Sequence, residues 1–369
     1  MNDLRRRLPW GLIGALALVA GGERFVARHP LDFTNTATLS WRLSEHAARR
    51  EATRGQILCL GDSLVKHGLL PAVIETRSGR TAYNLSICAA QAPASFFLLR
   101  RALEAGARPS AVVIDLMPDL LAGGPRYPRR NWPELADLRD AIDLALTARD
   151  ASLLASTLVG LALPSARGRD EIRAVIRAIL RGQGHPHRAA NLAHHRNWRV
   201  NLGAEFCPPN PAFQGAVTED QHRKLLSHAF WCHPVHRAYI HRLLDLAAAH
   251  DITIFWLLPP VSPQVQARRE QTGADEKQAA FLRSFLPRHP NLVVLDARRS
   301  GYGPSVFLDP IHLDGRGGIA LSLAVADAIA RPGPGRWIKL PAYQDPSLDR
   351  PFEDIEQSRL ALEGQAMRR

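Results

Sequence analysis

The chain has 369 residues, of which 46% are hydrophobic, and its formal net charge is +12. This composition supports a proper core, and the length fits a single α/β domain with an insertion and tails. The basic charge favours an anionic neighbour, and nucleic acid is the least supported choice, because no zinc-finger spacing, aromatic RNA-binding signature or long basic recognition helix is present. We expect no nucleic-acid partner.

The N-terminus combines a charged start with an apolar stretch. Arg5 to Arg7 precede the mostly apolar residues Leu8 to Gly22, as in an export signal. The stretch has about 15 residues, whereas a full span needs roughly 20. A cleaved signal, an uncleaved anchor and a buried helix of a cytosolic protein all remain open. We favour an anchor over residues 1–30, because no small-x-small cleavage site follows; the positive-inside tendency then places the remaining chain on the extracytoplasmic, periplasmic face.

Residues 31–54 are predicted to form a helical stem, after which strands and helices alternate. The first half of this α/β core, residues 55–119, is predicted to contain strands Ile57–Leu60, Ala82–Ser86 and Ala111–Leu116, with helices from Leu64 and over Pro93–Gly106.

A second α/β segment, residues 233–332, resumes the same alternation. Its predicted elements are a helix at His236–His250, a strand at Ile252–Leu258, a helix at Asp275–Leu286, a strand at Leu292–Leu295 and a helix at Gly317–Ala330. The alternation predicts a parallel sheet that is covered by helices on both faces. The tail, residues 333–369, is expected to be peripheral.

Residues 120–232 interrupt the alternation and are predicted to be a largely helical insertion. Its expected helices are Trp132–Arg149, Ala151–Leu163 and Asp170–Arg181, followed by the polar segment Gly182 to Arg199. Because the insertion leaves the third strand at the edge expected to carry the site, it could form a lid or a substrate wall. A helical cap that only buries core surface is the alternative.

The cysteines, together with the histidines and arginines of the insertion, are weaker candidates for functional sites. Cys207 and Cys232 could pair, whereas Cys59 and Cys88 are expected to be small buried residues. We predict no metal and no cofactor, because the insertion's histidines lie among arginines without an adjacent carboxylate; they are His185, His187, His194 and His195. A further group could hold an acidic glycan or form a solvated face: Arg126, Arg129 and Arg130, beside Tyr127 and Trp132.

Two short motifs carry the chemistry. Gly61-Asp62-Ser63-Leu64 follows the first strand, where a tight turn into a helix can present Ser63 on an exposed corner. Asp309-Pro310-Ile311-His312 places a carboxylate and an imidazole three residues apart, so that Asp309 can orient His312 towards a serine. Either motif alone is common; their combination and order predict a Ser-His-Asp triad.

With these two motifs the chain resembles the SGNH/GDSL hydrolase superfamily. The resemblance covers the split core and implies a flavodoxin-like three-layer α/β/α sandwich with a parallel sheet. It also implies Ser63 as nucleophile, with His312 and Asp309 as its partners. In that superfamily the oxyanion hole is formed by the serine N–H, a glycine N–H in a second block and an asparagine side chain in a third.

The second and third blocks depart from this pattern. The second block matches the run that begins at Asn84, with Ala89 where glycine is expected, and Asp119 stands where the third block would carry asparagine. Alanine keeps a backbone donor only in an ordinary conformation, and an ionised aspartate cannot donate unless burial keeps it protonated. The side chain of Asn84 or Gln91 could supply an amide instead, or Asp119 could be purely structural.

The sequence therefore predicts a membrane-anchored esterase or O-acyltransferase that forms an acyl-enzyme on Ser63. Its substrate would be a small-molecule or glycan ester, such as an O-acyl group of a cell-envelope polysaccharide. The competing hypothesis is a catalytically silent binding or scaffold protein that keeps the fold, which the changes at Ala89 and Asp119 favour. A soluble, cytosolic lipase-like enzyme is a third possibility.

Overall fold

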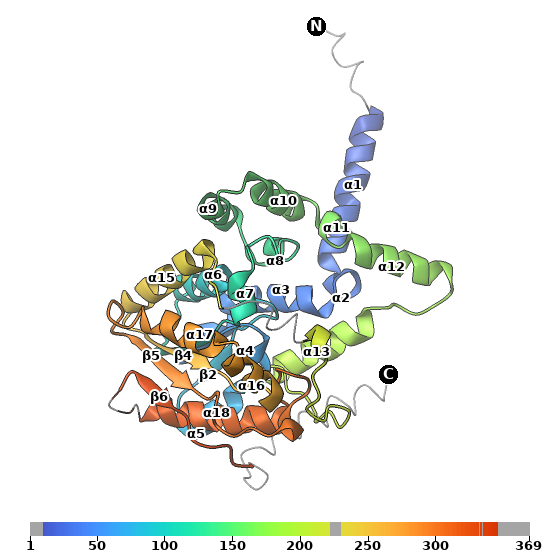
Figure 1. The fold of residues 1–369 in the computed structure, drawn as a ribbon. Helices are drawn as coiled ribbons and strands as arrows, with labels where there is room; N and C mark the ends of the chain where they lie inside the picture. Colours follow the sequence, from blue (N-terminus) through green and yellow to red (C-terminus); the bar gives the residue numbers. More distant parts are fainter. Residues whose placement is uncertain (1–9, 222–229, 332, 334, 346–369) are drawn as a thin grey trace.

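The computed structural model describes residues 10–221, 230–331, 333 and 335–345. Within them, six parallel strands form one sheet in the order β2-β1-β3-β4-β5-β6 (Figure 1). The strands are β1 (Ile57–Gly61), β2 (Ala82–Asn84), β3 (Ala111–Asp115), β4 (Thr253–Leu258), β5 (Leu292–Asp296) and β6 (Trp337–Lys339). The first five follow the order of flavodoxin-like doubly wound sheets. The predicted α/β class with a parallel sheet is confirmed.

Successive strand residues enter two different cores. In β1, Ile57 and Cys59 pack with residues of α18 (Gly315–Ala330), whereas Leu58 and Leu60 pack with residues of the helices on the opposite face. Those opposite helices are α3 (Thr36–Ala48), α6 (Ala92–Glu104) and α15 (Pro234–Ala248). A strand that is buried on both faces reads as a continuous apolar run, which explains the sequence of β1. The covered sheet is compatible with a three-layer α/β/α arrangement.

Shorter helices complete the core. α4 (Ser63–Gly68) follows β1, and α5 (Pro71–Ser78) packs against α18. α16 (Pro263–Gln271) and α17 (Ala274–Arg283) lie between β4 and β5, and the 3-10 helix η3 (Pro304–Val306) precedes α18. The two motifs predicted to be catalytic therefore lie in the connections that leave β1 and β5 at their carboxyl ends, the edge at which parallel sheets usually carry their sites.

The insertion differs in two places from its prediction. It contains α7 (Pro118–Ala122), α8 (Trp132–Leu135), α9 (Leu138–Ala148), α10 (Ala151–Ala162), α11 (Pro164–Arg167), α12 (Arg169–Leu180) and α13 (Arg188–Val200). The single helix predicted over residues 132–149 is two helices, because Asp137 caps a new one by accepting a hydrogen bond from the Asp140 N–H. The expected polar segment after Gly182 contains α13.

The stem is helical, as predicted, but α3 is part of the core rather than a spacer. The Trp41 side chain of α3 is fully buried and packs edge-on against Trp132, with ring centroids 5.2 Å apart. Two short helices flank α3: α2 (Pro30–Phe33) and η2 (Glu51–Arg54). The stem therefore fixes the N-terminal segment to the α/β body.

The C-terminal tail was expected to be peripheral, and this is wrong for residues 337–339. They form β6, which pairs with β5, and the Trp337 indole N–H donates to the Asp296 carboxylate over 3.2 Å. The Pro- and Gly-rich run before them concealed so short a strand in the sequence. Residues 346–369 lie outside the described part.

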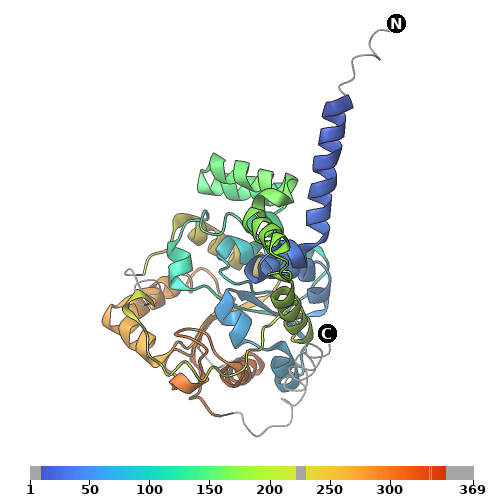
Figure 2. The same cartoon turned by 90° about the vertical axis from the view of Figure 1, so that its right-hand side faces the viewer.

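α1 (Trp10–Arg28) projects from the body, and none of its residues is buried (Figures 1 and 2). By length and composition it can cross a membrane, although a signal sequence passes the same test. The helix therefore supports attachment to a membrane, but it does not show on which side of the membrane the body lies.

Candidate active site

Ser63 is the first residue of α4 and follows β1 after a turn that only glycine can make. Gly61 has a φ of +121°, and a Cβ at this position would lie 2.2 Å from the backbone oxygen of Asp115. The turn directs the chain sharply from the strand into the helix. As the first helical residue, Ser63 has a backbone N–H without an acceptor inside the helix.

Asp62 connects this turn to the neighbouring strand. Its Oδ1 accepts a hydrogen bond from the Leu64 N–H at 2.9 Å, and its Oδ2 accepts one from the Met117 N–H at 2.8 Å. The side chain is fully buried, and burial raises the pKa of Asp62 to about 7 against the lowering effect of these two donors. Asp62 thus caps α4 and holds the ends of β1 and β3 together.

The structure brings the three predicted triad residues together. His312 Nε2 lies 2.7 Å from Ser63 Oγ, and His312 Nδ1 lies 2.7 Å from Asp309 Oδ2. Asp309 Oδ1 accepts hydrogen bonds from the N–H groups of Ile311 and His312, both at 2.9 Å. Burial acts to raise the pKa of Asp309, but its bonds to the His312 ring and to these backbone donors hold it below the ordinary value.

The loop that carries Asp309 and His312 is held on several sides. Within the loop, the Leu308 N–H donates to the His312 carbonyl at 2.8 Å. The Ser262 N–H donates to the Pro310 carbonyl at 2.9 Å, and the Gly315 N–H donates to the Cys207 carbonyl at 2.8 Å. The imidazole side chain is 20% exposed, so it is positioned by the protein and still accessible from solvent.

Ala89 occupies a left-handed backbone conformation, with a φ of +58°. This is the region that favours glycine, so the expectation that an alanine keeps this donor only in an ordinary conformation is wrong: Ala89 adopts the glycine-type conformation itself. The loop nevertheless lies beside the serine turn, because the Ile87 N–H donates to the Gly61 carbonyl at 2.9 Å. The alanine therefore keeps a glycine-type turn next to the site at the cost of local strain.

Neither amide proposed as a substitute donor is free. Asn84 is fully buried, and its Nδ2 donates to the carbonyls of Val65 and Leu69 at 3.1 and 2.9 Å. Gln91 Nε2 contacts three carbonyl oxygens around α7, those of Leu120, Gly123 and Gly124. The tentative placement of Asn84 in an oxyanion hole is therefore wrong: both amides hold loops in position.

Asp119 lies in the first turn of α7 with an incompletely satisfied carboxyl group. Its Oδ1 is buried and makes no hydrogen bond, and burial raises the pKa of Asp119 to about 6. The negative charge of Asp119 also contributes to the raised pKa of Asp62, after the larger effect of burial. At neutral pH Asp119 is mostly ionised, and below its pKa it becomes a hydrogen-bond donor.

A buried ionisable group behind the serine helix was missed by the sequence analysis. Lys66 is fully buried, and its Nζ contacts the carbonyl oxygens of Ser86 and Gly203 at 3.4 and 3.2 Å. Burial lowers the pKa of Lys66. The position of Lys66 in the helix that begins at Ser63 gave no indication that its side chain is buried.

Three possible metal ligands gather beside Lys66. Atoms of His67, Cys88 and Glu205 lie within 4.8 Å of one another. Cys88 and Glu205 also act electrostatically on Lys66, and a lysine ammonium in the same space disfavours a metal cation. Burial raises the pKa of the Cys88 thiol to about 11, which disfavours the thiolate that a metal requires. The donor set fits a buried polar network better than a metal site.

The remaining sequence candidates are dispersed. The predicted Cys207–Cys232 pairing is wrong, because all four cysteines are free; Cys207 Sγ instead lies 3.4 Å from His67 Nδ1. His194 pairs with Glu205 at 3.3 Å, and Arg126 and Arg130 form ion pairs with carboxylates of the insertion. Arg126 and Arg130 therefore serve first to join helices of the insertion.

No family model matches this chain, and no curated protein matches it at a significant level. The geometry of the site and the two sequence motifs are therefore the observations that bear on function.

Proposed function

We propose that this protein is a membrane-anchored serine esterase or O-acyltransferase of the SGNH/GDSL type. The observation that carries the proposal is the double contact of His312, which lies 2.7 Å from both the Ser63 hydroxyl and the Asp309 carboxylate. A silent scaffold has no physical need for this alignment of hydroxyl, imidazole and carboxylate. The strand order and the position of Ser63 after β1 also support membership of this fold group.

In the proposed reaction, Ser63 Oγ attacks the carbonyl carbon of an ester and its proton passes to His312 Nε2. Asp309 holds the opposite ring N–H and stabilises the imidazolium. The tetrahedral oxyanion collapses, the carbon–oxygen bond to the leaving alcohol breaks, and His312 returns the proton to that alcohol. The resulting acyl-enzyme is then attacked by water or by a sugar hydroxyl, which gives hydrolysis or acyl transfer.

In the proposed oxyanion site, this chain differs from the SGNH/GDSL pattern. The backbone N–H groups of Ser63 and Ala89 are the proposed hydrogen-bond donors. An ionised Asp119, which cannot donate, stands where the pattern has an asparagine side chain as the third donor. Loss of one oxyanion donor typically lowers turnover by about a hundred- to a thousandfold. We therefore propose a slow enzyme whose turnover depends on the protonation of Asp119.

The proposed substrate class is based on the net charge of the chain and on the anchor, and not on the triad. The net charge of +12 favours an anionic acceptor or surface, and an anchor would keep the site at the membrane. We propose an extracytoplasmic O-acyl group, with a cell-envelope polysaccharide as donor or acceptor.

Labelling with a fluorophosphonate probe tests the function. The full chain in membranes is expected to form a covalent adduct on Ser63, and both Ser63→Ala and His312→Gln should lose it. Ser156→Ala is a matched control, because that hydroxyl contacts only a backbone carbonyl on α10. Absence of labelling in protein that is folded by circular dichroism would support the scaffold hypothesis instead.

Intact-protein mass spectrometry separates the two proposed fates of the acyl group. After brief exposure to an activated acetyl ester, the native chain should gain one acetyl group on Ser63. If added oligosaccharide removes this group faster than water does, the protein is a transferase; equal rates would identify a hydrolase.

A further inference from the structure

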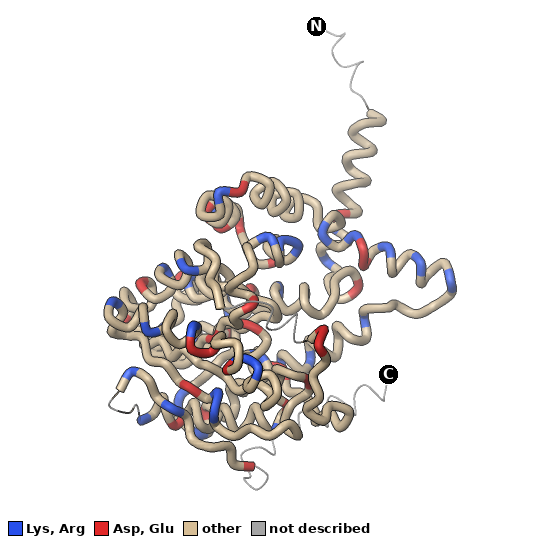
Figure 3. The backbone as a smooth tube through the Cα atoms, in the orientation of Figure 1, with Lys and Arg blue, Asp and Glu red and all other residues tan. Residues whose placement is uncertain are grey.

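The helix α10 has an unusual composition for the surface of a water-soluble domain. It contains no Lys, Arg, Asp or Glu (Figure 3). Of its residues, only Leu153, Thr157 and Gly160 are buried. These three positions form one face, at a spacing of four and three residues. The opposite face exposes Leu158 and Val159, so the apolar character of α10 exceeds what its packing uses.

Two other helices of the insertion also expose apolar side chains. On α9 they recur every four residues, and on α12 they lie near the C-terminal end, where Leu180 is 81% exposed. Together with α10, these helices expose Leu138, Ile142, Leu146, Leu158, Val159, Ile176, Ile179 and Leu180, which we call the apolar surface. α9 packs against α10, and α11 connects α10 with α12. Exposed apolar side chains that gather on neighbouring elements of a monomer mark an interaction site.

Basic side chains accompany the apolar residues of α12. Exposed arginines occur at every fourth position and continue just past the helix: Arg169, Arg173, Arg177 and Arg181. Figure 3 shows this basic stripe along α12. A helix that combines Ile and Leu on one face with Arg on another is typical of segments that lie in the interface of an anionic membrane.

A direct contact fixes the position of this region relative to α1. Glu23, the first charged residue after the apolar part of α1, accepts a hydrogen bond from the Ser165 N–H at 2.8 Å and one from its hydroxyl. Ser165 lies in α11, between α10 and α12. Figures 1 and 2 show α9 and α10 at the end of the molecule from which α1 projects.

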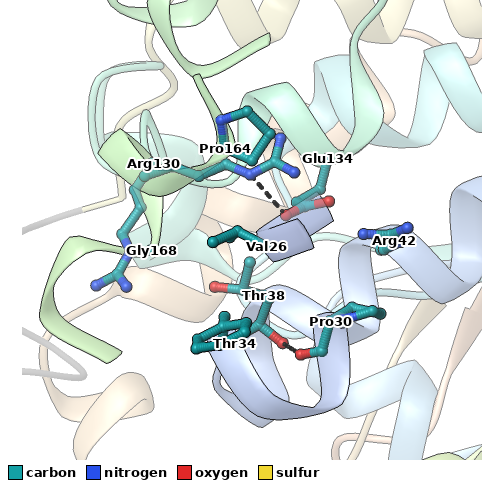
Figure 4. A pocket seen from close by; sticks show the side chains of 11 residues that line it. Val26, Pro30, Thr34, Thr38, Arg42, Arg130, Glu134, Pro164 and Gly168 are labelled. Atoms are coloured by element: carbon teal, nitrogen blue, oxygen red, sulfur yellow. Dashed lines mark hydrogen bonds and ion pairs between the residues drawn. The ribbon is translucent and has the colours of Figure 1, made fainter. Parts of the chain in front are cut away.

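The joint between the stem and the insertion is closely packed and charged. Around a small cavity between α2, α3 and α11, Arg167 pairs with the Glu134 carboxylate at 3.0 Å (Figure 4). Nearby, Asn35 donates to Glu171 at 2.9 Å, and Arg188 pairs with Asp32 at 2.8 Å. These buried and half-buried contacts hold α11, α12 and α13 in a defined orientation to α1.

We propose that the apolar surface is a second membrane contact, which seats the insertion in the headgroup region of an anionic bilayer beside α1. The proposal rests on α1 as an anchor and is independent of the chemistry at Ser63. Charge complementarity and continuity with α1 identify a lipid surface as the occupant. The stem and insertion then act as a platform, and the triad is carried by the α/β body below it.

The length of α1 agrees with this arrangement. Its apolar part, Trp10 to Gly22, rises only about 20 Å, whereas the hydrocarbon core of a bilayer is about 30 Å thick. Interfacial helices are buried about 5–10 Å into the boundary between headgroups and acyl chains. If Glu23 and α11 lie about 5–10 Å below the membrane surface, the apolar part of α1 has to cross only the remaining thickness of the hydrocarbon core, roughly 20–25 Å.

Photo-crosslinking to lipid tests the proposal on the full chain. Vesicles of phosphatidylcholine, with or without phosphatidylglycerol, would carry a trace of lipid with an acyl-chain diazirine, and adducts would be mapped on tryptic peptides. The peptide Asp150–Arg167, which contains α10, should be crosslinked along with α1. The similarly apolar peptide that begins at Gly317, on α18 at the far end, should remain at background. Adducts on α12 should increase several-fold with the anionic lipid.

Charge-insertion variants provide the control. Leu158→Glu together with Val159→Glu should reduce adducts on the α10 peptide at least fivefold, while Thr76→Glu on the distant α5 should change nothing. If the double variant does not fold, Leu180→Glu on α12 tests the same surface. Adducts confined to α1 would overturn the proposal, since a protein partner would then be the better explanation of the apolar surface. Absence of adducts on α1 itself would remove the anchor and the proposal with it.

Discussion

At the scale of single residues, Ala89 has the clearest mismatch between side chain and backbone. Its φ of +58° places a Cβ in the left-handed region, which costs an L-residue roughly 1–2 kcal/mol. Ala89→Gly would remove this strain but would add about 0.4–1 kcal/mol of unfolded-state entropy. We therefore expect a net stabilisation of about 0.5–1 kcal/mol.

Chemical denaturation of Ala89→Gly and wild type measures this difference. Gly79→Ala is a useful opposite control, because Gly79 has a φ of +68° and open space around it. The substitution adds strain without a clash, and this strain should outweigh the unfolded-state entropy that it removes. A destabilised Ala89→Gly protein would mean that the alanine methyl group contributes packing that outweighs its strain. Since the backbone N–H is kept, ester turnover should not fall.

In the proposed oxyanion site, turnover is expected to depend on the protonation of Asp119. The pKa of Asp119 is about 6, so the side chain is mostly ionised at pH 7.5 and mostly protonated at pH 5. Asp119→Asn supplies a neutral donor at every pH and should raise kcat about ten- to a hundredfold at pH 7.5. The gain should shrink below pH 6, where the wild-type carboxyl can itself donate. A pH profile of both proteins measures this; an equal or lower rate at pH 7.5 would contradict the assigned position.

The same variant has a stability readout that does not depend on catalysis. The folded-state pKa of Asp119 lies above its ordinary value of 3.8, so the folded protein holds the proton more tightly and loses stability as pH rises from about 4 to 7. Asp119→Asn lacks this loss. The stability of the variant relative to wild type should therefore increase over that range, by about 2–3 kcal/mol at most.

The triad residues themselves were predictable because their chemistry is local. Gly61 to Leu64 and Asp309 to His312 each encode a turn and a side-chain role within four residues. The roles of Asn84 and Gln91 were not predictable, because they depend on carbonyl groups delivered by distant segments. Burial of Lys66 was equally hidden, since the loop that covers it comes from residues around Gly203.

At the scale of elements, periodic apolar runs located the buried strands well and the short elements poorly. β1 and β3 are buried along their whole length, and their predicted bounds differ from the observed ones by one residue. β6 has two partly exposed residues and one exposed residue after a Pro- and Gly-rich run, so its place in the sheet is set by pairing with β5 rather than by its own pattern. Tertiary contacts decide such edge strands.

The predicted helix boundaries in the insertion are wrong for a different reason. The break between α8 and α9 depends on the Asp137 cap, and α13 is polar on most of its surface, which conceals its periodicity. Asn191 and Trp198 are nevertheless buried on one face of α13, and Asn191 Nδ2 donates to the carbonyls of Leu31 and Thr34. A helix that is anchored by polar contacts to α2 gives no apolar stripe to detect.

At the scale of the whole molecule, the insertion, for which a lid or substrate wall and a helical cap were both open, divides into two parts. Residues after α13 do approach the triad, because the Glu205 N–H donates to the Lys66 carbonyl at 3.0 Å and the Cys207 carbonyl accepts from Gly315. The helices α10 and α11 instead pack among themselves and against α1 and α8. One insertion therefore supplies both a wall beside the site and a platform beside the proposed anchor.

Removal of the apolar part of α1 separates these two roles. A chain that begins at Glu23 keeps the contact with Ser165, and it should still fold because no residue of α1 is buried. If the apolar surface and the arginines of α12 contact lipid by themselves, this chain should still bind vesicles that contain phosphatidylglycerol, but weakly. Raising the salt from about 0.05 to 0.5 M should release most of it, because the Debye length falls well below 10 Å.

Vesicle sedimentation measures that binding, and Arg177→Glu in the same shortened chain should weaken it at low salt. A charge reversal at the far end, Lys339→Glu on β6, should leave it unaltered. Complete loss of binding at low salt would show that α1 alone attaches the protein. Binding that survives high salt would mean that the apolar residues contribute more than the charges, since area burial is not screened by ions.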